Sequence, residues 1–105
     1  MMTEDDKYGR MLETIKASLS VTWDEEDTDM KIIRIMEDAE DKLNHILGAE
    51  MDYTASGPAR RLFINYCMYV WNGVEKDFKT NYLSDIYELR RINEVKSYVE
   101  SKDVQ

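Results

Sequence analysis

The sequence predicts an all-α protein, a small bundle of about four helices. Apolar residues recur every three to four positions along most of its 105 residues, as on the buried face of a helix. The chain has only four glycines and one proline, too little turn material for a many-stranded β fold. Its 43% hydrophobic and 34% charged residues are typical of a globular protein. We therefore expect residues 1–105 to form one helical domain, with residues 1–5 and 101–105 frayed.

The first two helices are indicated by apolar stripes and by the residues at their ends. Residues 8–19 have the spacing of an amphipathic helix. An acidic cluster follows, in which Asp24 or Asp27 is suited to cap the next helix and to face the positive end of its dipole. This second helix is expected over residues 25–47. Gly48 then stands where a left-handed glycine ends a helix.

The second half of the chain predicts two more helices after a loop at residues 49–57. Pro58 fits the first position of a third helix, expected over residues 58–79. This helix is apolar over more than half of its circumference, which is typical of a central helix or one with two partners. A glycine at position 73 weakens it internally. Asn81 and Ser84 offer a boundary before a fourth helix at 82–99, but no proline forces a break, so the two helices could be nearly continuous.

The predicted core combines the apolar stripes of the second and third helices. We expect most of it to consist of Met30, Ile33, Met36, Leu43, Leu47, Leu62, Tyr66 and Val70. Tyr66, Tyr69 and Trp71 fit core packing, but tyrosine and tryptophan are also enriched at protein interfaces. Both readings stay open for these aromatic residues.

Charge and composition exclude several classes of protein. The formal net charge is −8, and it is uneven: residues 1–57 carry 15 acids and 6 bases, whereas residues 58–105 carry 7 acids and 8 bases. An acidic protein is poorly suited to tight DNA binding or to an anionic membrane. No apolar run is long enough to cross a bilayer, and the acidic start does not resemble a signal peptide, so we expect synthesis and folding in a cytosol.

The sequence offers no convincing catalytic or metal site, and we expect neither an enzyme nor a cofactor. A calcium-binding EF-hand loop starting at Asp24 would require glycine and glutamate where Asp29 and Ile35 stand. His45 lies one helical turn after Asp41, but no nucleophile accompanies this pair. The single cysteine, at position 67, lies in the most apolar helix and is expected to act as a small hydrophobic residue.

Three stretches together resemble a known family. They read Leu-Ser-Val-Thr-Trp-Asp-Glu-Glu-Asp at 19–27, Ala-Arg-Arg-Leu-Phe-Ile-Asn-Tyr-Cys at 59–67 and Asn-Tyr-Leu-Ser-Asp-Ile-Tyr-Glu-Leu-Arg at 81–90. In this order the chain resembles the small head–tail connector proteins of tailed bacteriophages and prophages. The resemblance spans residues 6–96 and depends on the ordered set, since none of the stretches is catalytic.

The resemblance implies a ring of identical helical subunits in the virion neck, made in the bacterial host cytoplasm. Such a ring lies between the portal protein and tail-side adaptor proteins and extends the DNA channel, with DNA passing as cargo without sequence-specific binding. A ring requires two different, complementary surfaces on each subunit, which the acidic first half and the balanced second half could supply. Candidates for the subunit contacts are Arg60, Arg61, Trp71, Tyr82, Tyr87 and Arg90. A further hypothesis is that acidic residues line the channel. Such a wall would make few contacts with the DNA phosphates, so the DNA could slide through without sticking.

A second class of function fits the same composition. The chain would then be an acidic helical regulator that binds a single partner protein as a monomer or dimer. Self-association distinguishes the two hypotheses, because such a regulator does not require a ring. A helix-turn-helix DNA-binding protein is disfavoured, since none of the expected helices has a sufficiently basic face.

Overall fold

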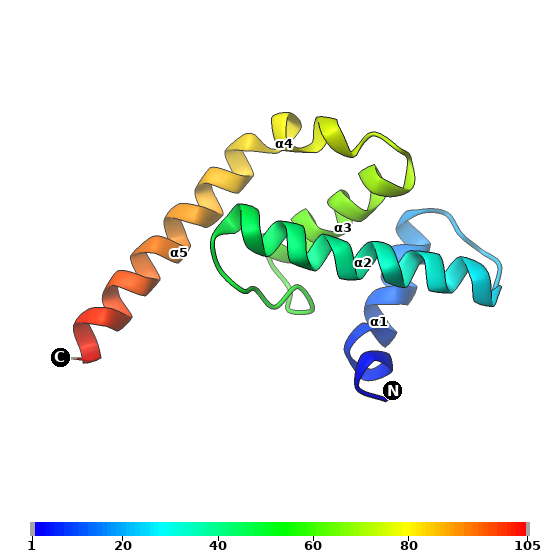
Figure 1. The fold of residues 1–105 in the computed structure, drawn as a ribbon, viewed down its shortest axis with the longest axis horizontal. Coiled ribbons are helices and arrows are strands. Elements are labelled where there is room, and N and C mark those ends of the chain that lie inside the picture. Colours follow the sequence, from blue (N-terminus) through cyan, green and yellow to red (C-terminus); the bar gives the residue numbers. More distant parts are fainter. Residues whose placement is uncertain (1, 105) are drawn as a thin grey trace.

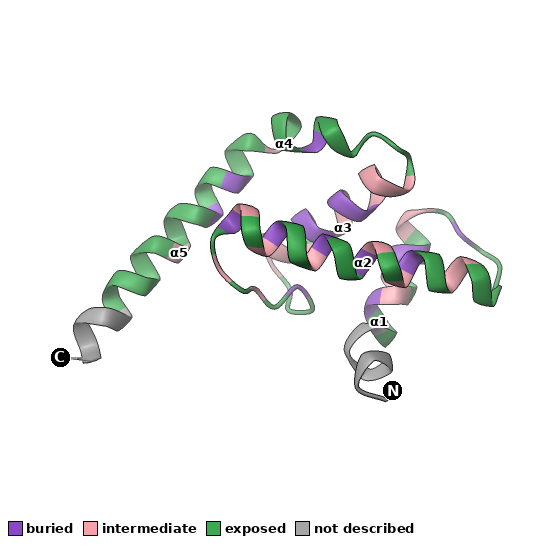
Figure 2. Cartoon of the chain, viewed as in Figure 1, coloured by how far each residue is buried: buried purple, intermediate pink, exposed green. Residues whose placement is uncertain are grey.

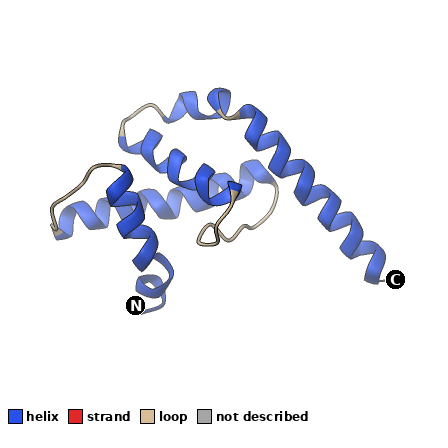
Figure 3. Cartoon of the chain, turned by 180° about the vertical axis from the view of Figure 1, so that it is seen from behind, coloured by secondary structure: helices blue, strands red, loops and turns tan. Residues whose placement is uncertain are grey.

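The structure, a computed structural model, describes residues 2–104, and side chains over residues 9–99. Its elements are α1 (Met2–Ser18), α2 (Glu26–Leu47), α3 (Pro58–Trp71), the 3₁₀ turn η1 (Glu75–Asp77), α4 (Phe78–Asn81) and α5 (Leu83–Val104). Figures 1 and 3 show these helices from opposite sides, and the described part of the chain contains no strand. The predicted all-α bundle is confirmed. The ends expected to fray have no described side chains, and residues 1 and 105 lie outside the described chain.

Helix α2 is the centre of the bundle and packs against α1, α3 and α5. Its buried residues recur at steps of three and four, so they form one straight stripe along the helix. This stripe consists of Ile32, Met36, Ala39, Leu43 and Leu47. The other helices contribute Met11, Ile15, Leu62, Phe63, Tyr66, Cys67, Phe78, Ile86 and Leu89 to the core. In Figure 2 most of the buried positions lie where these helices pack together.

The predicted core is right at five positions, partly right at Val70 and wrong at two. Met36, Leu43, Leu47, Leu62 and Tyr66 are buried as expected. Val70 is half-buried and packs against this core, whereas Met30 is 45% exposed and Ile33 is only half-buried. Each three-residue step falls about 60° short of a full helical turn, so the line from Met36 back to Met30 rotates away from the core. Ile32, four residues before Met36, stays on the buried face and is fully covered.

Both glycines that follow α2 and α3 end these helices in the same way. Gly48 has a φ of 73°, as predicted, and Gly73 has a φ of 76°. After each, the next backbone N–H reaches back to a carbonyl oxygen five residues earlier: Ala49 to Asn44 at 3.2 Å, and Val74 to Tyr69 at 2.9 Å. This is the Schellman arrangement, which satisfies the last carbonyl groups and stops the helix.

The expectation that the third and fourth helices run nearly continuously is therefore wrong. Helix α3 stops at Trp71, and the chain turns through Gly73 into η1 and the single turn of α4 before α5 begins. A left-handed residue reverses the direction of the chain, and glycine adopts this conformation without steric cost. No proline is needed for this break.

Helix α5 leaves the body of the molecule as an arm (Figure 1). Only Ile86 and Leu89 are buried along its described part. The molecule measures 52 × 34 × 19 Å, and its radius of gyration is 15.1 Å. A compact chain of this length would have a radius of about 13 Å. None of the helices in the described part of the chain combines the length and apolarity that a membrane span requires.

Candidate interaction surfaces

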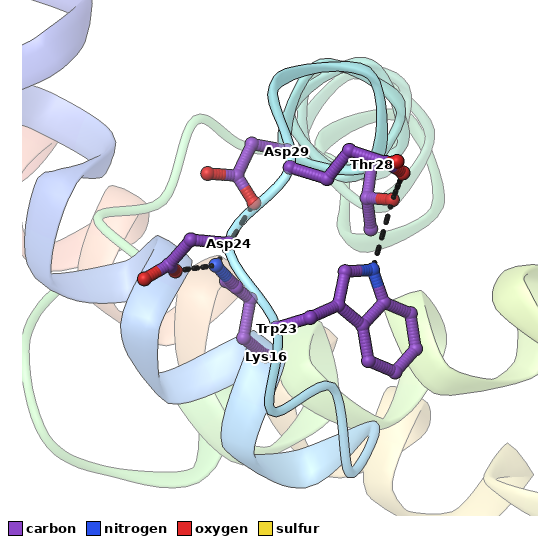
Figure 4. Close-up of polar contacts among 6 residues, drawn as sticks. Lys16, Trp23, Asp24, Thr28 and Asp29 are labelled. Atoms are coloured by element: carbon purple, nitrogen blue, oxygen red, sulfur yellow. Dashed lines mark hydrogen bonds and ion pairs between the residues drawn. The ribbon is translucent and has the colours of Figure 1, made fainter.

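The turn between α1 and α2 is held by a nearly buried lysine. The Nζ atom of Lys16 lies 2.8 Å from Oδ1 of Asp24 and 2.9 Å from Oδ1 of Asp29 (Figure 4). Only 4% of Lys16 is exposed, although it is a charged residue near the surface. The hydrogen bonds to Asp24 and Asp29 raise the pKa of Lys16, and the bond from Lys16 lowers the pKa of Asp24. A charged ion pair thus fixes the end of α1 to the start of α2.

Neither predicted cap is used, and the ion pair accounts for the role of one of them, Asp24. The N-cap position of α2 is Glu25, whose side chain makes no capping hydrogen bond. Asp24 is one residue too early and bonds to Lys16 instead. Asp27 lies inside the first turn of α2, where its charge still faces the positive end of the helix dipole.

The indole of Trp23 is held in place although it is 50% exposed. Its Nε1–H donates to Oγ1 of Thr28 at 3.2 Å, and the Thr28 hydroxyl donates to Oε1 of Glu25 at 2.9 Å. Figure 4 shows this pair beside the Lys16 cluster. We call residues 23–27 the acidic turn, since they present one ordered indole among four carboxylates. The sequence pattern marks the acids of this turn, but a single tryptophan beside them carries no signal of an interaction residue.

A groove lies at the opposite end of α2, where its last turn meets α4 and α5. Its lining consists of His45, Ile46, Lys79, Leu83, Ile86, Tyr87 and Arg90, and we call it the α5 groove. The lining contains no acidic residue, and it combines two permanently basic side chains with exposed apolar ones: Leu83 is 40% exposed and Tyr87 59%. A groove of this kind suits an acidic partner that carries a large apolar side chain.

The six predicted interface residues do not form one surface. Tyr87 and Arg90 share the α5 groove, while Arg61 is exposed on α3. Trp71 is half-buried, with Nζ of Lys31 at 5.0 Å from its ring centroid. The remaining two contact neighbouring helices within the chain.

Those two residues are Tyr82 and Arg60. Tyr82 stacks on Phe78, with ring centroids 4.7 Å apart, and meets Tyr69 edge-on at 5.7 Å. Arg60 is half-buried and donates from Nη2 to Oγ1 of Thr14 at 3.5 Å. Both therefore support the packing of helices in this chain, and the sequence could not separate this role from an interface role.

The groups considered for chemistry are dispersed or buried. Cys67 is fully covered, and burial raises the pKa of its thiol to about 12. Tyr53 stacks on Phe63 and donates from its hydroxyl to Oδ1 of Asn44 at 2.8 Å, which holds the loop after α2 against the core. Among the described residues, no three His, Cys, Asp or Glu side chains lie close enough together to hold a metal ion.

Comparison with protein-family models, with curated proteins and with solved structures found no significant match. Function is therefore inferred from the residues and surfaces described above.

Proposed function

We propose that this chain is a structural subunit of a ring, the head–tail connector of a tailed phage or prophage. Its neighbours in the neck are other copies of itself, the portal protein and tail-side adaptor proteins. The ring extends the channel through which DNA passes as cargo. The subunit performs no catalysis in this role.

The observation that carries this proposal is the surface left uncovered by the fold. The accessible surface is 7400 Å², whereas a compact monomer of 12.4 kDa exposes about 6,100 Å². A subunit that is compact only within an assembly is expected to have such an excess.

The exposed apolar side chains support more than one contact surface. Of the large apolar residues that are exposed in the described part of the chain, six lie on α5: Leu83, Tyr87, Ile92, Val95, Tyr98 and Val99. The other three, Trp23, Met30 and Val74, lie outside α5, the first two around the start of α2. Two different surfaces at separate places favour a ring over an isologous dimer, which uses one surface twice.

The solution mass tests this proposal. Light scattering behind a sizing column, from low micromolar to near millimolar protein, is expected to show a discrete species on the order of ten or more subunits. Electron microscopy of that species is expected to show closed rings with a central channel. An assembly that stops at a dimer, or open filaments of variable length, would contradict the ring.

A further inference from the structure

We propose that the acidic turn of one copy docks into the α5 groove of the next copy, with the Trp23 side chain filling the groove. This inference rests on the proposed ring and names the two surfaces that join its subunits. It uses the ordered turn of residues 23–27 and the groove formed by α2, α4 and α5.

The two surfaces are complementary in charge. The acidic turn carries Asp24, Glu25, Glu26 and Asp27 within four consecutive positions, and all four are exposed. The α5 groove contains the basic side chains of Lys79 and Arg90, and its lining includes no acidic residue. Opposite potentials of this kind orient two surfaces as they approach and disfavour pairing of either surface with itself.

The surfaces also match in shape and in residue type. The acidic turn projects an indole, and the groove is a hollow with Leu83, Ile86 and Tyr87 in its lining. Tryptophan, tyrosine and arginine are the residues most often found at the energetic centre of an interface. The hydrogen bond from Trp23 to Thr28 orders the indole before contact, which reduces the entropy lost on binding.

The two surfaces of one molecule cannot meet each other. The acidic turn precedes the first residue of α2, whereas His45 and Ile46 lie in its last turn. A helix of 22 residues is about 33 Å long, so the rigid α2 holds the two surfaces apart. Figure 1 shows the start of α2 far from the α5 side of the molecule. Contact therefore requires a second copy, and each added copy presents the same two surfaces again.

A mixing experiment tests this pairing, because each copy carries both surfaces. Trp23→Ala disables the turn and keeps the groove, while Arg90→Glu disables the groove and keeps the turn. Each variant alone is expected to associate at least tenfold more weakly than the wild type. Mixed together they retain one good pairing, so sedimentation velocity is expected to show a 1:1 dimer and no larger species. Glu26→Lys is a second variant of the turn, to be used if Trp23→Ala melts earlier than the wild type.

Arg91→Glu is the matched control. It changes the net charge by the same amount as Arg90→Glu, but Arg91 lies about 100° further around α5 and does not line the groove. Association of the control is expected to stay within about twofold of the wild type. Equal weakening by Arg90→Glu and Arg91→Glu would overturn the role of the groove.

The possible results separate this inference from the proposed function. Wild-type rings together with a variant mixture that stays monomeric would overturn the pairing and leave the ring in place. A wild-type chain that is monomeric at every concentration would overturn the pairing of free subunits. Wild-type assembly that ends at a dimer would overturn both the pairing and the ring.

Discussion

Helices α2 and α5 each have 22 residues, yet the fold uses them in opposite ways. Helix α2 has a stripe of buried residues from Ile32 to Leu47 and is covered by three other helices. Over the residues of α5 whose side chains the structure describes, only Ile86 and Leu89 are buried, and apolar side chains further along the helix face solvent. In Figure 2 almost all of the described part of α5 is exposed. The two helices therefore contribute unequally to the stability of the fold, although they have the same length.

This difference indicates which residues contribute to the stability of the single folded molecule and which do not. The apolar stripe of α2 is buried within one molecule, so substitutions there should change the free energy of unfolding. Exposed apolar residues of α5 beyond Leu89 gain little from folding, so substitutions there should act on association instead. The following predictions test this division, beginning with the largest expected effect.

Leu43→Ala is expected to destabilise the fold by about 2–5 kcal/mol, because it leaves a cavity in the fully buried stripe of α2. In a domain of this size, the melting temperature should fall by roughly 10 °C or more. Thermal unfolding followed by circular dichroism measures this change. A melting temperature close to that of the wild type would show that the buried face of α2 is wrongly assigned.

Two isoleucines on α5 offer a matched pair. Ile86 is 1% exposed and Ile92 is 48% exposed, so the same change to alanine should have unequal effects. We expect Ile86→Ala to lower the free energy of unfolding by about 2–4 kcal/mol. Ile92→Ala should change it by less than about 0.5 kcal/mol. Urea titration of both variants measures the difference, and similar losses would mean that the arm is part of the folding core.

Arg61→Ala tests a predicted interface residue that lies outside both proposed surfaces. Arg61 is exposed on α3, so its loss should leave the melting temperature within a few degrees. If Arg61 makes a further subunit contact beside the pairing of the acidic turn with the α5 groove, its loss should weaken association several-fold, as measured by light scattering over a dilution series. Arg34→Ala on α2 removes the same charge from another exposed position and is the control. An unchanged assembly size for Arg61→Ala at every dilution would remove Arg61 from the interface.

The ion pair at the start of α2 predicts a response to acid. Because the folded pKa of Asp24 lies below its ordinary value of 3.8, its contribution to stability is present above that pH and is lost as pH falls through the folded pKa. The pKa of Lys16 is raised above 10.5, so its contribution persists up to that pH. We expect Trp23 fluorescence, in a Trp71→Phe background, to change below about pH 3.8. This change should be smaller in Asp24→Asn.

Local signals in the sequence predicted the last residue of α2 and the first residue of α3. Gly48 and Pro58 act through their own backbone, so their roles can be read without knowing the neighbours. Gly73 carried a similar signal, and it ended α3 where a continuous helix was expected. A glycine inside an apolar helical pattern does not by itself show whether it bends the helix or ends it.

Tertiary features were not predictable in the same way. The bond from Lys16 to Asp24 joins residues eight positions apart across a turn, and no helical or strand periodicity brings them together. The α5 groove joins His45 to Arg90, which meet only because α5 folds back onto the end of α2. Residue type alone marks Tyr87 and Arg90 as interface candidates, but it does not single out His45, Lys79 and Leu83, whose shared location comes from the fold.

The short connection from Gly73 to Tyr82 sets the direction in which α5 leaves the body. In a closed ring, the rotation that relates one subunit to the next is a full circle divided by the number of subunits. The α5 groove is built across this connection, since Lys79 comes from α4 and Ile46 from α2. A change of a few degrees in the angle at which α5 leaves this connection would therefore alter the curvature of the assembly. The number of subunits needed to close the circle would change with it.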